Sequence, residues 1–264
     1  MKPTLKKSLS PSRTQIRNVR EAEEPVQEKQ LAISQPIQTD ENGVEGELNR
    51  SDITTPSLKI VQAIGPLSEH FEGGVVVLNG EIPICDEPDK NNPTPLRLTV
   101  IRIKKQYEEN LEHGGENRPR VFKSENDVIA AGGHCNWVNN RKPPFSPIAT
   151  MLVAVKAPDT NDETILANFP HVFNSKTKEC KHLNGAYALA LYKTKGSSYT
   201  RVAKLVFNAA LMSDLKAKGL VYGDWAFGSK REKINNNFVF VPVMKRVGTH
   251  PDEFVEFLQH ISSM

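Results

Sequence analysis

Five short stretches of the sequence combine Lys or Arg with aromatic residues, a pairing that can bind nucleic acid. They are Lys104–Tyr107, Arg118–Lys123, Trp137–Phe145, Tyr192–Arg201 and Tyr222–Arg231. A site for single-stranded nucleic acid needs cations for the phosphates and flat rings for the bases, each stacked base contributing about 1–3 kcal/mol. Strand surfaces carry the same mixture without this function, because Lys and Arg lay their aliphatic stems over aromatic rings. The pattern therefore predicts either a nucleic-acid groove or an ordinary strand face near the surface.

Residues within these stretches are the candidates for direct contact with nucleic acid. The stacking surfaces would be Tyr107, Trp137, Tyr199 and Trp225. The phosphate contacts would come from Lys104, Lys105, Arg120, Arg141, Lys142, Arg201, Lys230 and Arg231. Stacking and phosphate contacts distinguish poorly between bases, so we expect binding without strong sequence preference.

No recognisable catalytic signature accompanies these residues. Val153–Lys156 is similar to the lysine strand of a protein kinase, but no catalytic-loop or magnesium motif follows it. Gly228–Lys230 lacks the glycine spacing of a P-loop, and Asp159–Glu163 lacks the central glycine and distal glutamate of a calcium loop. The sequence therefore predicts a protein that is not an enzyme and holds no cofactor.

One group of residues has the chemistry of zinc ligands. It consists of His134, Cys135, Cys180 and His182. Tetrahedral zinc needs four convergent ligands, whereas adjacent side chains diverge and a Cys-x-His spacing is tighter than usual. We expect ordinary packed or surface side chains and no metal, with a structural zinc site as the open alternative.

The composition bounds the class of protein. The chain has 264 residues, 38% hydrophobic content and a formal net charge of +3. This length can bury one sizeable core or two small ones, and the small net charge means that nucleic-acid affinity must come from local patches. No apolar run approaches the roughly 20 residues that span a bilayer, and no secretion signal is recognisable. We expect a cytoplasmic protein with reduced cysteines and no membrane contact.

Residues 1–53 form a charged leader. The first 20 residues carry six basic residues and no acid, whereas residues 21–52 carry nine acids and two basic residues. The leader has no aromatic residue and little hydrophobic periodicity, so it cannot offset the entropy cost of ordering, and we expect disorder. It is either a solubilising tail or a segment whose acidic part competes with nucleic acid for the basic surface of the body.

Residues 54–264 should form one β-rich nucleic-acid-binding domain. Its clearest local signal is Asn79-Gly80 between two apolar runs, because a type I′ hairpin turn needs positive φ at both central residues. Leu96–Ile103 alternates as a strand that ends at the two following lysines, and Ala149–Lys156 has the apolar run of a central strand. Tyr187–Tyr192 is expected to be another strand.

The last third of the domain mixes helices with an antiparallel pair of strands. From Ser198 onward the apolar residues recur at helical spacing. Leu220–Phe227 and Phe238–Met244 are expected to pair, joined by a charged loop over Ser229–Asn237. A terminal helix should begin near His250 and seal the core with its apolar face.

Three segments carry a resemblance to a known family. Thr55–Gln62 opens the domain, Gly196–Lys204 precedes a helix, and Phe238–Val243 lies near the end of the chain. Their order, over about residues 53–264, resembles tailed-phage early proteins commonly assigned as single-stranded DNA-binding proteins with an OB-like barrel. The resemblance implies single-stranded DNA as ligand, replication or recombination proteins as partners, and the host cytoplasm as location. Such proteins often end in an acidic tail, whereas this chain ends in Gln259–Met264 and has its acidic stretch near the N-terminus.

These observations predict an α+β, β-rich fold with a middle helix and a C-terminal helix. The sheet would be an OB-like barrel or a strongly curved antiparallel sheet. The function we expect is binding of single-stranded DNA in replication or recombination. The alternative is a non-enzymatic phage protein, structural or interacting, that binds a host or phage partner through an edge strand or the charged leader.

Overall fold

The computed structural model describes residues 55–85, 96–111, 118–139, 141–234 and 237–264. The chain divides into two units after Ile53, and the described fold belongs to the second unit, Thr54–Met264. The predicted leader, residues 1–53, lies outside the described residues. Within the described ranges, no helix has the length and apolar composition needed to cross a membrane.

Strands dominate the fold. They are β1 (Leu58–Ile60), β2 (Val76–Leu78), β3 (Ile82–Cys85), β4 (Leu96–Glu109), β5 (Val121–Phe122), β6 (Phe145–Lys156), β7 (His171–Phe173), β8 (Gly185–Lys195), β9 (Gly223–Ile234) and β10 (Asn237–Thr249). The α-helices are α1 (Glu125–Ala130), α2 (Glu163–Leu166), α3 (Lys204–Met212), α4 (Leu215–Lys218) and α5 (Asp252–Ser263). A π-helical turn, Tyr199–Ala203, leads directly into α3.

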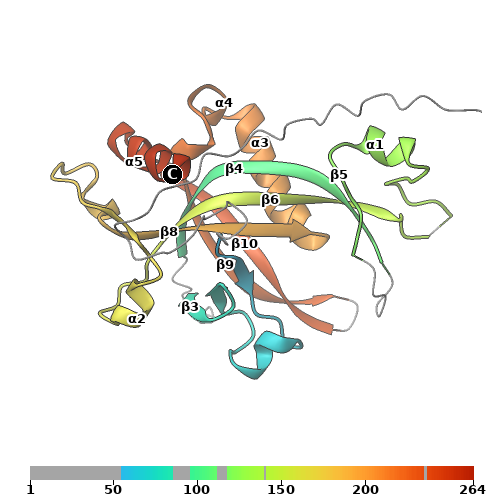
Figure 1. Cartoon of the computed structure of the whole chain (residues 1–264), viewed down its shortest axis with the longest axis horizontal. Coiled ribbons are helices and arrows are strands. Elements are labelled where there is room, and N and C mark those ends of the chain that lie inside the picture. The colour runs from blue at the N-terminus through green and yellow to red at the C-terminus, as the bar shows by residue number, and fades with distance from the viewer. Residues whose placement is uncertain (1–54, 86–95, 112–117, 140, 235–236) are drawn as a thin grey trace, which may run out of the picture. The chain divides into compact units, whose positions relative to one another are not determined.

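The strands form two antiparallel sheets. The larger has the order β10-β9-β4-β6-β8-β7, with β5 added to β4, and the smaller has the order β1-β2-β3. Figure 1 shows β4, β6 and β8 side by side as long curved strands. The α+β, antiparallel prediction is confirmed, but in the described part of the chain β10 and β7 end the sheet without pairing, so there is no closed barrel.

Opposite faces of the large sheet are covered by different helices. Side chains alternate between the two faces along a strand, so Val153 and Ala154 of β6 point in opposite directions. Val153 packs in one cluster with Val206 of α3, whereas Ala154 packs with Phe254 of α5. We call these surfaces the α3 face and the α5 face.

A β-bulge in β4 changes which residues reach each face. The register with β6 is Val100 opposite Val153 and then Arg102 opposite Leu152, so Ile101 is an extra residue in β4. Such a bulge shifts the alternation of all later side chains by one position. Arg102 and every second residue after it therefore lie on the α5 face.

The small sheet is tied to both sides of the large one. The Leu191 amide of β8 donates to the Pro56 carbonyl at 2.7 Å. At the other side, the Gln62 side chain makes two hydrogen bonds with the backbone of Phe240 in β10. Gly73 lies so close to the Phe240 ring that a Cβ atom there would overlap it. The β1-β2-β3 sheet therefore occupies the space between β8 and β10 without joining them into one continuous sheet.

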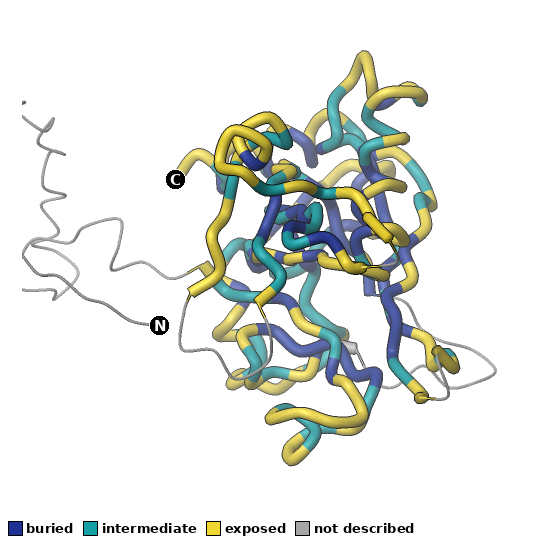
Figure 2. Tube along the Cα trace, turned by 90° about the vertical axis from the view of Figure 1, so that its right-hand side faces the viewer, coloured by how far each residue is buried: buried dark blue, intermediate teal, exposed yellow. Residues whose placement is uncertain are grey.

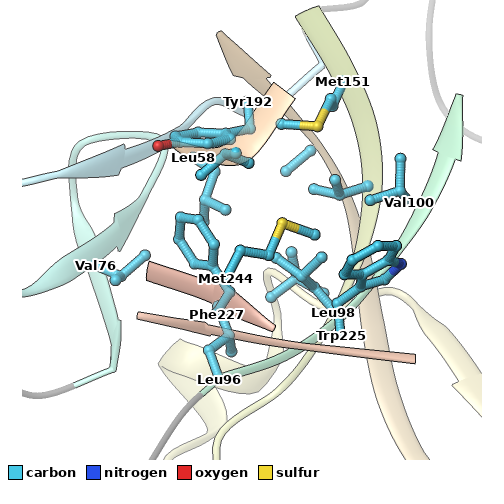
Figure 3. Close-up of a cluster of buried hydrophobic side chains, with 14 of the residues drawn as sticks. Leu58, Val76, Leu96, Leu98, Val100, Met151, Tyr192, Trp225, Phe227 and Met244 are labelled. Carbon is cyan, nitrogen blue, oxygen red and sulfur yellow. The ribbon is translucent and has the colours of Figure 1, made fainter. Parts of the chain in front are cut away.

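The main core lies between the α3 face and the small sheet. Figure 3 shows Trp225 and Phe227 of β9 among aliphatic side chains from β4 and Leu58 and Val76 from the small sheet. Figure 2 shows buried residues gathered in the interior of the described fold and exposed residues along its outlying segments. Trp225 is 1% exposed, which makes it a packing residue of this core.

Local signals predicted several elements correctly. Asn79 and Gly80 have φ values of 56° and 79°, as a type I′ turn requires. The terminal helix is present as α5, with Phe254 and Leu258 buried. Two expected strand ends were wrong, because β4 continues through Glu109 and β9 continues through Ile234.

Candidate nucleic-acid interface

Three of the four aromatic residues predicted to stack on bases are buried. Trp225 is 1% exposed, and Tyr107 and Tyr199 are each 6% exposed. Tyr107 packs against Phe145, and Tyr199 packs against Ala149 on the α3 face. Burial of these rings contributes to stability and leaves no ring face open for a base. The prediction that these three residues form stacking surfaces was therefore wrong.

Trp137 is the predicted aromatic that does lie at the surface, with 69% of it exposed. It belongs to the segment between α1 and β6, where the backbones of Val138 and Arg141 form an antiparallel bridge. Arg141 and Lys142 follow and are both exposed. The described residues of this segment, 132–139 and 141–142, are called the Trp137 loop below. One exposed ring and two exposed cations thus belong to the same loop.

Several predicted phosphate-binding cations are engaged within the protein. The Arg120 guanidinium donates to both carboxylate oxygens of Glu109, at 3.0 and 2.8 Å. Arg201 and Lys230 both bind Glu232, at 2.5 and 2.7 Å, and hydrogen bonds led by that of Lys230 hold the pKa of Glu232 below its usual value. These are solvent-exposed ion pairs of small energetic value. They nevertheless reduce the positive charge that these residues offer to a ligand.

Two further predicted cations lie against aromatic rings. The Lys105 ammonium is 5.1 Å from the centre of the Tyr107 ring, and the Arg231 guanidinium is 4.2 Å from that of Phe238. Lys105 pairs with Ala149, whose side chain packs on the α3 face, so Lys104 beside it points to the α5 face. Of the two neighbouring lysines, only Lys104 therefore belongs to the open surface described next.

Four exposed cations share the part of the α5 face that α5 itself does not reach. Opposed residues of antiparallel strands point to the same side, and the registers place Lys104, Thr150 and Lys193 in one row across β4, β6 and β8. The neighbouring rows contain Arg102 on β4 and Lys195 on β8. All four cations are exposed. We call Arg102, Lys104, Lys193 and Lys195 the basic face.

A buried carboxylate fixes two of these lysines. Glu108 is 6% exposed and accepts hydrogen bonds from Lys193 and, at 2.9 Å, from Lys195. Burial acts to raise the pKa of Glu108, but the hydrogen bonds and charges of the two lysines outweigh it and hold the pKa below its usual value. Glu108 therefore stays ionised and orders one edge of the basic face. Its single negative charge is outnumbered by the four positive charges of that face.

Three members of the basic face were missing from the predicted set. Arg102, Lys193 and Lys195 were not among the predicted contacts, although Lys193 and Lys195 fall in one of the five stretches. The spacing of two residues between Lys193 and Lys195, and between Arg102 and Lys104, is the available signal, because such residues share a strand face. Recognising the face itself requires the register of β4, β6 and β8.

Comparisons of the chain with protein-family models, with curated proteins and with solved structures found no match. The resemblance to tailed-phage early proteins therefore stays a prediction. The interpretation of the site consequently depends on the geometry of the basic face and the Trp137 loop.

The residues of zinc-ligand type do not converge. Cys135 packs with Tyr107 and Phe145, whereas Cys180 is buried in the cluster of α5. Burial raises the pKa of the Cys135 thiol, which disfavours the thiolate that a metal needs. His134 Nδ1 lies 2.9 Å from the Asn136 carbonyl. Within the described ranges, no three His, Cys, Asp or Glu side chains are grouped for a metal ion.

Proposed function

We propose that this protein binds single-stranded DNA, with little sequence preference, through the basic face. The supporting observation is the register that aligns Lys104 with Lys193 and places Arg102 and Lys195 in the adjoining rows. Same-face residues lie roughly 7 Å apart along a strand and neighbouring strands about 5 Å apart, so these cations are close enough for successive phosphates. Replication or recombination remains the setting that we expect.

The side chains between the cations suit unpaired bases better than a duplex. Thr150 and Gln106 offer hydrogen-bonding groups, and Leu191, 37% exposed, offers an apolar surface beside Lys193, in the row that Arg102 shares with Leu152. Modules that bind single strands commonly present a sheet in this way, whereas duplex DNA is usually contacted by a helix or ribbon in a groove. The Trp137 loop leads into β6 at the end of the sheet where Lys195 lies, and Trp137 would supply a stacking surface there.

Fluorescence anisotropy of a labelled oligonucleotide tests this proposal with the full chain. Single-stranded and duplex forms of equal length are titrated over a salt series. We expect the protein to prefer the single strand. A plot of the logarithm of the binding constant against the logarithm of the salt concentration should have a slope of about −0.7 for each phosphate contact.

Two variants that each remove one lysine charge test whether the basic face, rather than the overall charge of the protein, binds the DNA. Lys104→Gln should weaken binding and reduce the salt slope by about 0.7, whereas Lys216→Gln in α4 should leave both unchanged. Equal effects of the two variants, equal affinity for the duplex, or no binding at low salt would contradict the proposal.

An unpaired strand edge supports a second candidate, binding of a protein partner. A groove of about 700 Å3 lies between β1 and the start of β10, with Ile60, Val239 and Pro242 among its apolar lining residues. We propose as the alternative function that an extended peptide of a partner protein lies in this groove and pairs with β10 before Phe240, because Gln62 already occupies the outer N–H and carbonyl of Phe240. A charged residue in the groove, Val239→Glu, would abolish that binding, whereas Lys104→Gln, which lies outside the groove, would leave it intact.

A further inference from the structure

A separate polar pocket lies at the other end of the α5 face, where α5 and the turn Lys181–Leu183 cover the sheet. Its volume is about 280 Å3. Its polar lining comes from Arg97, Thr99, Lys156, His182, Asp224 and His250. None of these residues belongs to the basic face, so the pocket is independent of the proposed DNA contact.

Two cations of the pocket keep unused hydrogen-bond donors. Arg97 donates from Nε to Asp224 Oδ1 at 3.1 Å and from Nη2 to Oδ2, so one edge of its guanidinium is fixed by a buried carboxylate. Lys156 donates to the His182 carbonyl at 3.1 Å. A guanidinium has five N–H groups and an ammonium has three. Both side chains therefore have further N–H groups for a ligand, as far as the described residues show.

A buried histidine forms the uncharged wall of the pocket. His250 is 6% exposed, and its Nε2 lies 2.7 Å from the Oγ1 of Thr99, which is 3% exposed. Burial lowers the pKa of His250 to about 4, although the Asp224 carboxylate acts in the opposite direction. The ring is neutral at pH 7, and no hydrogen bond from the described residues reaches its Nδ1 atom. The neutral ring therefore adds no charge to the pocket.

Charge and shape together define the ligand. The formal charges of Arg97, Lys156 and Asp224 sum to +1, and neither histidine of the pocket adds a negative charge. Ala154 and Phe254 supply apolar walls. A cavity of about 150 Å3 holds benzene, so this pocket has room for a ring of that size with one anionic group. We propose that the pocket binds a small organic acid, with its carboxylate between Arg97 and Lys156.

Isothermal titration calorimetry on the full chain tests this site with benzoate as the probe. We expect saturable binding at one site, and at least about tenfold weaker binding of benzamide, which has the same shape without the charge. Inorganic phosphate should bind at least about tenfold more weakly than benzoate, because it carries more than one charge and has no apolar body.

Two variants localise the binding. Lys156→Met keeps the aliphatic stem and should weaken benzoate binding at least about tenfold. Lys245→Gln removes a lysine on the same sheet face, opposite Ala226 and outside the pocket, and should change affinity by less than about twofold. NMR signals of the His250 ring should shift with benzoate in the unmodified protein.

Four outcomes would overturn the assignment. They are no saturable binding up to about 10 mM benzoate, equal affinity for benzamide, equal affinity for phosphate, and an unchanged affinity in Lys156→Met. Because Lys104 lies outside the pocket, a failed DNA titration leaves this experiment unaffected, and the reverse also holds.

Discussion

The side-chain amide of Gln62 pairs with the backbone of Phe240 as a neighbouring strand would. Gln62 Nε2 donates to the Phe240 carbonyl at 2.9 Å, and the Phe240 amide donates to Gln62 Oε1 at 3.2 Å. These two bonds join residues 178 positions apart in the sequence. They connect the segment after β1 to the outer edge of β10, which has no strand partner on that side in the described residues.

Replacing Gln62 should therefore weaken the attachment of the small sheet. Gln62→Leu removes both bonds and should lower the free energy of unfolding by about 1 kcal/mol, a modest loss because Gln62 is exposed and water can take its place. Urea denaturation measures the change. Gln106→Leu, at an amide without a hydrogen bond in the described residues, should stay within about 0.5 kcal/mol of the unmodified protein; equal losses would contradict this role for Gln62.

The contact between Gly73 and Phe240 predicts a larger effect. Gly73→Ala places a methyl group against the Phe240 ring and should destabilise the protein by about 1–3 kcal/mol, because a packed site cannot expand without strain. Gly228→Ala is the matched control, since nothing lies within 4 Å of a Cβ atom there. Denaturation midpoints that fall equally for the two variants would argue against the close approach.

The two tryptophans should respond oppositely to substitution. Trp137→Ala should weaken single-strand binding by about 1–3 kcal/mol with unchanged stability, because the side chain is exposed. Trp225→Ala should instead destabilise the fold by about 3–5 kcal/mol, because the indole fills the main core. Anisotropy and thermal unfolding, measured on both variants, distinguish the roles. Unchanged affinity in Trp137→Ala would remove this residue from the interface.

His250 should make stability depend on pH. Its pKa of about 4 in the folded protein lies below the ordinary value of 6.5, so between these values the unfolded chain binds a proton that the folded protein does not. The contribution of this group to the free energy of unfolding is therefore fully present above about pH 6.5. The free energy of unfolding falls by up to about 3 kcal/mol as the pH drops to about 4. Asp224, Arg97 and His182 are the charged or titratable groups that act on the ring.

Urea denaturation at pH 7 and pH 4.5 measures this loss. His250→Gln keeps a polar partner for Thr99 without a group that titrates in this range. The difference between the two pH values should be smaller in this variant than in the unmodified protein. An identical pH dependence of the two proteins would show that other groups cause it.

Signals within a few residues of each other predicted the local structure well. The Asn79-Gly80 turn follows from the backbone freedom of these two residues. The apolar face of α5 follows from helical spacing. Each of these features depends on neighbours in the sequence, so the sequence alone was sufficient.

The candidate site depends on strand pairing and was only partly predictable. Tyr107 and Trp225 fall in stretches that also contain cations, yet both rings point into the core because of their register positions. Lys104 and Lys193 lie 89 positions apart and come together only through β6. No local pattern contains that pairing, whereas the exposure of Trp137 agrees with the glycine-rich loop around it.

The extra residue at Ile101 makes β4 intolerant of changes in length. With one residue fewer before Arg102, this side chain and Lys104 would turn toward the buried α3 face, and Ile103 and Tyr107 would turn toward solvent. Homologues that conserve the basic face must therefore conserve the spacing between Val100 and Arg102 as strictly as the charges themselves. Transfer of this face to another scaffold would require the bulge to be transferred with it.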